Sequence, residues 1–183
     1  MLFSIKNKGY FTLSVFIIIL FGSIAFAKAI NNIQINADIF ELDGKNNIVT
    51  ASGSVTVIQK EVKIKGDRAT YDKAKSKISM FDNIKITKDN MSVYCDKVHA
   101  DNNKDLIEAI GNVRFSLEGI NGISEKALYD LRKQKITLLG KPSAQRNKDK
   151  LMGEIIIIDL ETNKIITKGS ARVILAEESL QKN

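Results

Sequence analysis

The chain of 183 residues carries 28 lysine and arginine residues against 21 aspartate and glutamate residues, a formal net charge of +7. Because the basic residues are spread along the sequence without an accompanying aromatic series, we do not expect a nucleic-acid-binding protein. The single cysteine, Cys95, excludes an intramolecular disulfide, and with the single histidine, His99, it provides no metal-site spacing, so we expect neither a metal nor a cofactor.

The beginning of the chain is typical of an export signal. Two lysines precede a strongly apolar run without charges, and the sequence Ala25-Phe26-Ala27 fits the small-x-small pattern of a cleavage site. The alternative is an uncleaved membrane anchor, because the 18 residues from Tyr10 to Ala27 reach the lower limit for crossing a bilayer.

A repeat of 29 residues organises the rest of the chain. Three columns keep this spacing through five copies: Asp38, Asp67, Asp96, Glu125 and Glu154; Asp43, Asp72, Asp101, Asp130 and Asp159; and Gly53, Asp82, Gly111, Gly140 and Gly169. Short units with one apolar face cannot stand alone, so they are expected to stack and bury a continuous core.

Each copy predicts β-structure. Apolar residues alternate with polar ones, as in Val55 and Val57, which indicates strands with one buried face. The second acidic column opens turns, since an aspartate carboxylate accepts hydrogen bonds from backbone N–H groups just ahead of it. The glycine column marks a bend that requires positive φ.

The fold class that follows is all-β. We predict an open, elongated β-jelly roll built from five 29-residue repeats, because tight aspartate-led turns favour antiparallel hairpins. A parallel β-helix is the alternative with the same periodicity. The expected organisation is a signal peptide or anchor at residues 1–27, the β-domain at 28–175, and a short polar tail at 176–183.

The sequence resembles the OstA-like family. The resemblance lies in residues 33–38 (IQINAD), 53–57 (GSVTV) and 64–67 (IKGD), with later copies at 109–113 (AIGNV) and 152–154 (MGE). It implies an open jelly roll in the periplasm that binds the acyl chains of lipid A between two sheets. It also implies a non-enzymatic carrier or bridge that moves lipopolysaccharide from the inner to the outer membrane.

The resemblance further implies partners. These are the jelly-roll domains of the inner- and outer-membrane transport components, and further copies of the chain in a head-to-tail homo-oligomer. Three other functions stay open on the sequence: the membrane-anchored inner-membrane partner of the same pathway, a β-helical polysaccharide-processing enzyme, and a structural solenoid without a lipid ligand.

Catalysis finds little support in the residues. The acidic residues recur in every copy, whereas a catalytic carboxylate pair is expected once. His99 stands in a column of unrelated residue types, and Cys95 stands in a column of small residues, which indicates packing. We expect no catalytic site.

Candidate binding residues come mainly from the strands that carry the resemblance. The lipid-binding candidates are Ile33, Ile35, Val62, Ile64, Ile86 and Phe115. The alternative is that these side chains only fill the core. The first and last strands have no further repeat to pair with, so Ile33, Ile35, Val173 and Leu175 are the candidate assembly edges. The alternative there is a charged C-terminal tail that blunts the edge.

Overall fold

The computed structural model describes residues 33–176, and within this range the chain forms 14 β-strands and no helix. The expected signal peptide or anchor, and the tail beyond residue 176, lie outside the described residues. No helix in the described part of the chain is long and apolar enough to cross a membrane.

The strands fall into long and short ones. The long strands are β3 (Ile48–Gln59), β4 (Val62–Asp72), β5 (Lys77–Lys88), β6 (Met91–Asp101), β7 (Leu106–Leu117) and β8 (Ile120–Asp130). The short strands are β1 (Ile33–Asn36), β2 (Ile39–Asp43), β9 (Lys135–Leu139), β10 (Ser143–Arg146), β11 (Asp149–Met152), β12 (Ile155–Asp159), β13 (Lys164–Lys168) and β14 (Arg172–Ile174).

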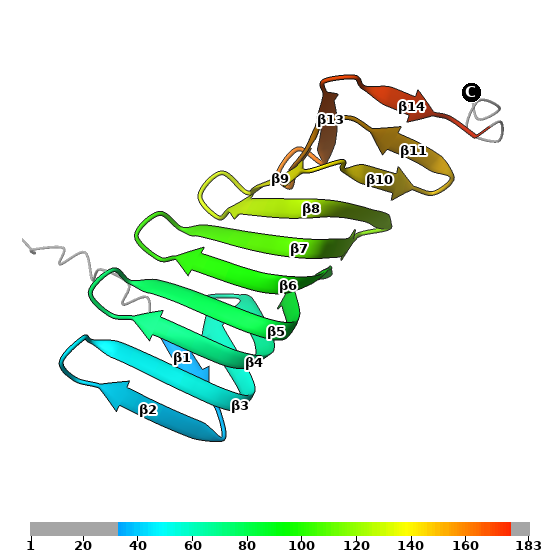
Figure 1. The fold of residues 1–183 in the computed structure, drawn as a ribbon. Coiled ribbons are helices and arrows are strands. Elements are labelled where there is room, and N and C mark those ends of the chain that lie inside the picture. The colour runs from blue at the N-terminus through cyan, green and yellow to red at the C-terminus, as the bar shows by residue number, and fades with distance from the viewer. Residues whose placement is uncertain (1–32, 177–183) are drawn as a thin grey trace, which may run out of the picture. The chain divides into compact units, whose positions relative to one another are not determined.

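Every strand pair in the described range is antiparallel, and successive strands pair with one another from β3 to β8 (Figure 1). The expected all-β jelly roll is confirmed, and the antiparallel pairing excludes the parallel β-helix. The order β1-β3-β4-β5-β6-β7-β8-β10-β11-β14 leaves the sheet open at both ends.

The expected bends occur at the glycine column. Gly53 and Ser54 both have positive φ, as do Gly111 and Asn112. At these residues the register shifts between β3 and β4 and between β7 and β8. Two consecutive residues in the left-handed region turn a strand sharply, and glycine tolerates that conformation at little cost. Asp82 takes the same conformation with a φ of 64°, so an aspartate serves where the other copies have glycine.

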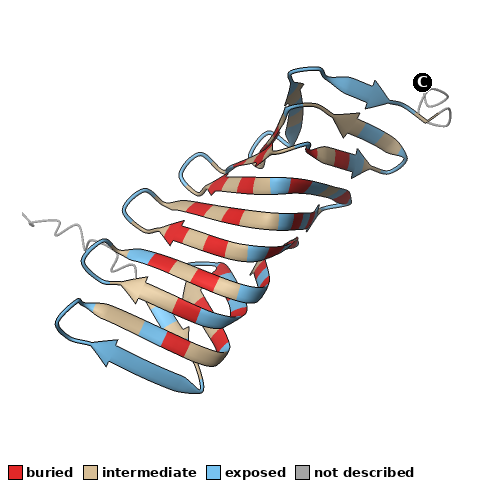
Figure 2. Cartoon of the chain, viewed as in Figure 1, coloured by how far each residue is buried: buried red, intermediate tan, exposed pale blue. Residues whose placement is uncertain are grey.

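The bends divide the strands into two layers that face each other. Layer 1 contains β2, β9, β12 and β13. The part of each strand from β3 to β8 that lies between the bend and the aspartate-led turn also belongs to this layer. Layer 2 contains β1, β10, β11 and β14 with the remaining parts of β3 to β8. Buried and exposed positions alternate along each long strand (Figure 2), so each layer has an inner apolar face and an outer polar one.

The turns of layer 1 use the aspartate column as expected. Asp43 Oδ1 accepts hydrogen bonds from the backbone N–H groups of Lys45 and Asn46, both at 3.0 Å. The equivalent Asp130 accepts from Arg132 at 3.1 Å and Lys133 at 3.0 Å. These bonds satisfy backbone donors that a tight turn leaves without ladder partners, which fixes where each hairpin reverses.

Candidate functional site

The buried hydrophobic cluster of the described chain lies between the two layers. All six lipid-binding candidates lie on the inner face of layer 2, in two adjacent cross-strand rows. Ile35, Ile64, Ile86 and Phe115 share one row, which also contains Val57 and Val93; Ile33 and Val62 lie in the next. The role of these residues in binding lipid stays a prediction.

Their burial differs along the row. Ile64 and Ile86 are each 3% exposed and Phe115 is 5% exposed, whereas Ile33 and Ile35 are only partly buried against the core. Phe115 lies over Gly122, because a Cβ atom at Gly122 would collide with its ring. Ile33 and Ile35 are therefore the most accessible of the six candidates.

The opposite wall was not assigned to the site from the sequence. It is the inner face of layer 1, in which Ile78, Ile107, Tyr129, Ile136 and Ile158 share a cross-strand row. Four of these residues are isoleucine, and part of the row follows a recurring β-branched column of the repeat. That column was the available signal, but periodicity does not tell which layer a strand segment joins.

The middle of the interior is filled by side chains. One cavity of about 30 Å³ lies between the layers, lined by Ile86, Met91 and Val93 from layer 2 and by Ile107, Ala109, Ala127, Tyr129 and Ile136 from layer 1. This volume is large enough for a water molecule but not for an alkyl chain. An alkyl chain would enter only if the layers separated or if it started from an end.

Both ends of the interior expose apolar side chains. Phe40 and Leu42 on β2 pair with inward-facing Ala51 and Val49, yet they are 51% and 64% exposed. At the other end, Val173 on β14 pairs with Leu151 and is 51% exposed. The inner rows thus continue to the end strands and remain uncovered there.

Polar contacts join the two layers on the side opposite the bends. Lys60, in a layer 2 turn, reaches Asp105 in a layer 1 turn at 3.1 Å. Lys88 donates to Tyr129 Oη at 2.9 Å and to Gln134 Oε1 at 3.2 Å, and the tyrosine hydroxyl donates to the same glutamine oxygen at 2.9 Å. We call this second group the clasp.

The clasp holds its lysine charged. Burial acts to lower the pKa of Lys88, but the hydrogen bond to Tyr129 and the nearby negative charges raise it above its usual value. At the turn, the hydrogen bonds from Arg132 and Lys60 hold the pKa of Asp105 below its usual range. Charged, hydrogen-bonded groups therefore close the long side of the interior, while its ends stay apolar.

The candidate assembly edges lie at opposite ends of layer 2. Within residues 33–176, β1 pairs only with β3 and β14 pairs only with β11, so Ile33, Ile35 and Val173 belong to end strands. Leu175 lies one residue beyond β14 and is 54% exposed. Layer 1 has its own end strands, β2 and β13, which the sequence analysis did not single out.

Cys95 and His99, the two residues considered for catalysis, lie in surroundings that indicate a structural role. Cys95 is 7% exposed, and burial raises the pKa of its thiol to about 11. Burial lowers the pKa of His99, whose Nδ1 lies 2.8 Å from Ser79 Oγ. Within residues 33–176, no group of three or more histidine, cysteine, aspartate or glutamate residues could hold a metal ion.

Comparison with known proteins gives one family. The family described as LptA/(LptD N-terminal domain) LPS transport protein matches residues 34–70 and 63–164. Among solved structures, the chain is similar to LptH from Pseudomonas aeruginosa, described as the LptA homologous periplasmic component of the conserved lipopolysaccharide transport device. That likeness has 14% sequence identity and a TM-score of 0.36, and it covers 80% of this chain and 96% of the other. No curated protein matches the chain.

Proposed function

Because the chain belongs to the family of LptA and LptD N-terminal-domain lipopolysaccharide transport proteins, we propose that it is a periplasmic carrier that holds lipopolysaccharide by its acyl chains. The observation that supports this proposal is the pair of apolar inner rows that run between the layers and stay uncovered at both ends. Each methylene group transferred from water to such a surface contributes about 0.8 kcal/mol, so a few buried carbons already give measurable affinity.

The geometry favours entry at an end. The first strand holds Ile33 and Ile35 partly buried, beside the exposed Phe40 and Leu42 of β2. An acyl chain placed there covers apolar surface without displacing the packed middle of the interior. Release of the clasp would let the acyl chain move deeper between the layers, which suits a protein that carries its ligand and then passes it on.

A charge at the first strand tests this role. Ile35→Asp should weaken capture of lipopolysaccharide by at least about tenfold, because an unpaired carboxylate among alkyl chains is costly. Folding should suffer less, since this residue lies at an end that water can reach. Gln34→Asp is the matched control, as it places the same charge on the outer side of the same strand.

The measurement compares lipopolysaccharide capture with the midpoint of thermal unfolding for both variants and the wild type. The proposal requires lost capture with a nearly retained midpoint in Ile35→Asp, and no change in Gln34→Asp. If Ile35→Asp loses both in equal proportion, Ile35 is only a core residue and the binding role is wrong.

We also propose that the protein moves lipopolysaccharide from the inner to the outer membrane as part of a bridge, with jelly-roll domains of the transport components at each membrane. The exposed end strands support this, since they offer backbone donors and acceptors for strand addition by another copy or by a related domain. The direction of transfer would follow from which end accepts lipopolysaccharide from a loaded donor protein.

A second candidate role is the membrane-anchored component of the same pathway, which the apolar run before Ala27 favours. N-terminal sequencing separates the two. We expect cleavage between Ala27 and Lys28 in protein recovered from the periplasm. Recovery of the uncleaved chain in the membrane fraction would favour the anchored role.

A further inference from the structure

Basic side chains have different surroundings on the outer faces of the two layers. On the outer face of layer 1, three cations lie beside acids on neighbouring strands: Lys77 lies 3.6 Å from Asp101, Lys135 lies 3.1 Å from Asp159, and Lys126 contacts Glu108. On layer 2, the outer face carries six exposed cations, namely Lys63, Lys65, Lys85, Arg114, Lys150 and Arg172. Within the described part of the chain, none of these six forms an ion pair.

The six cations lie in two straight cross-strand rows. The first row runs through Lys65, Lys85, Tyr94, Arg114, Ile123, Ser143, Met152 and Arg172. The second runs through Lys63, Thr87, Ser92, Ser116, Asn121, Gln145, Lys150 and Ile174. Neither row contains an acidic residue. We call these two rows the basic face.

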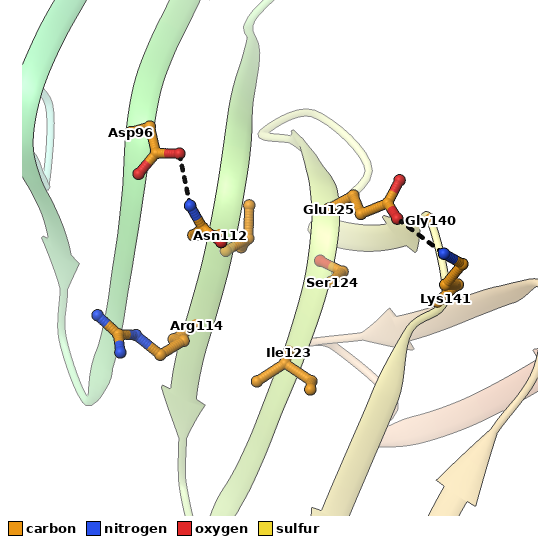
Figure 3. A pocket seen from close by; sticks show the side chains of 9 residues that line it. Asp96, Asn112, Arg114, Ile123, Ser124, Glu125, Gly140 and Lys141 are labelled. Carbon is orange, nitrogen blue, oxygen red and sulfur yellow. Dashed lines mark hydrogen bonds and ion pairs between the residues drawn. The ribbon is translucent and has the colours of Figure 1, made fainter.

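Acids that border the basic face on the bend side already have partners of their own. Asp96 accepts a hydrogen bond from Asn112 at 2.8 Å, and Glu125 lies 3.8 Å from Lys141. Figure 3 shows both contacts beside the hollow of about 530 Å³ that Arg114 and Ile123 also line. The bend acids therefore border the basic face at one side and leave Arg114 without an acidic partner.

Apolar side chains stand between the cations. Ile123 is 55% exposed and Tyr94 is 42% exposed, and Lys85 Nζ lies 5.4 Å from the centre of the Tyr94 ring. An aromatic ring with a polar tip is typical of residues that sit at the headgroup level of a membrane. A second hollow beside the Tyr94 ring is lined by Ser92, Tyr94, Arg114, Phe115 and Ser116.

We propose that the basic face of layer 2 docks on an anionic phospholipid surface. The cations are spread over strands from β4 to β14 and do not converge on one point, so they match negative charge distributed over a surface better than a single phosphate group. Tyr94 and Ile123 add apolar contact at the middle of the face. This docking is separate from acyl-chain binding, because the basic face and the inner rows lie on opposite sides of layer 2.

The test uses vesicles of phosphatidylcholine alone and vesicles in which part of it is replaced by phosphatidylglycerol. The protein is the exported form recovered from the periplasm. The test variant is Lys65→Thr with Lys85→Thr and Arg114→Thr. The matched control is Lys77→Thr with Lys164→Thr and Lys168→Thr, which removes the same charge from exposed strand positions of layer 1.

At low ionic strength, wild-type protein should sediment with the phosphatidylglycerol vesicles and much less with phosphatidylcholine alone. The test variant should lose affinity by roughly fivefold for each basic residue, on the order of 100-fold in total, while the control should change by less than about tenfold. Added salt should weaken wild-type binding. Equal binding to both kinds of vesicle, or equal losses in the two variants, would overturn the proposal.

A second readout identifies the face in contact. An environment-sensitive fluorophore on Ile123→Cys should shift to shorter wavelength with phosphatidylglycerol vesicles, whereas one on Ile166→Cys, exposed on layer 1, should not. Cys95→Ser supplies the background, because Ser124 occupies the equivalent position of the next repeat. A shift at Ile166→Cys instead, or binding that requires vesicles containing lipopolysaccharide, would contradict docking on phospholipid through this face.

Discussion

At the scale of single residues, the column of small residues beside the bends shows which side chains the repeat accepts at that position. Cys95 Sγ donates to the backbone oxygen of Lys97 at 3.4 Å, and Ser124 Oγ donates to that of Lys126 at 3.0 Å. The two side chains have the same place and the same partner one repeat apart. Cys95 is therefore the packed residue that its column predicted, although a size preference alone could not predict the hydrogen bond.

The thiol should be unreactive at neutral pH. Burial raises the pKa of Cys95 to about 11, so the thiol stays protonated, and the thiolate is the reactive form. Alkylation of the native protein is expected to be very slow at pH 7 to 8, to accelerate only as the pH approaches the raised pKa, and to become fast in denaturant. Rapid modification of the folded protein at neutral pH would show that this part of the fold opens.

Replacing a glycine of the bends with alanine should be costly for a local reason. Gly111 has a φ of 80°, and a Cβ atom there would collide with Asp96. Gly111→Ala is expected to lower the free energy of unfolding by about 2 kcal/mol, the sum of a left-handed conformation and a displaced carboxylate. Gly44→Ala is the control, since Gly44 has open space around it, and it should change stability by less than about 0.5 kcal/mol. Chemical denaturation of both variants is the measurement.

At the scale of elements, the alternation of apolar residues predicted the strands, and the aspartate and glycine columns predicted where they turn and bend. What the sequence could not show is that each bend transfers the strand into a second layer. The partners across the interior are also set by stacking: Lys60 meets Asp105, which lies 45 residues further along the chain. Contacts between residues so far apart in the sequence are not encoded in a local pattern. The clasp of Lys88, Tyr129 and Gln134 was therefore not predicted.

The turn aspartates should make the protein sensitive to acid. The backbone hydrogen bond from Thr162 and the hydrogen bond from Lys135 lower the pKa of Asp159 to about 2. A carboxyl group whose pKa is lowered by folding stabilises the protein above its unfolded pKa, and that stabilisation disappears as the pH falls through the folded value. Asp159→Asn should therefore lower the thermal midpoint at pH 5 and above, and the difference from wild type should shrink between about pH 4 and pH 2. A difference that is independent of pH would contradict this origin.

At the scale of the whole molecule, the repeated pattern in the sequence predicted the jelly roll. It did not show how apolar and basic residues are distributed over the inner and outer faces of the layers. The six lipid-binding candidates fall on one inner face because they share strand segments, whereas the opposite inner face was overlooked. The basic outer face was also missed, because its cations look evenly spread along the sequence. They gather only when the register places Lys65, Lys85 and Arg114 in one row.

The same scale explains why assembly is expected at the ends. Among the described strands, every interior one has neighbours on both sides, but β1 and β2 at one end and β13 and β14 at the other pair on one side only. The exposed large apolar side chains on or beside these strands are Ile39, Phe40 and Leu42 at the first end and Ile166, Val173, Ile174 and Leu175 at the last. The two ends are different surfaces, so a contact between them is heterologous and propagates into an open chain of copies.

A lysine at the last strand should stop this growth. Val173→Lys keeps the backbone intact and places a charge on an inner row that the next copy would cover, and lysine is a common guard of edge strands. Val173→Pro removes a backbone donor at the same position and should act in the same direction. Ile123→Lys is the matched control, because Ile123 is similarly exposed at 55% but lies on the interior strand β8. Light scattering over a concentration series should show wild type and Ile123→Lys associating, and both Val173 variants remaining as folded monomers with little change in thermal midpoint. A wild type that stays monomeric at high concentration, or association that persists in both Val173 variants, would mean that the end strands do not join copies of this protein.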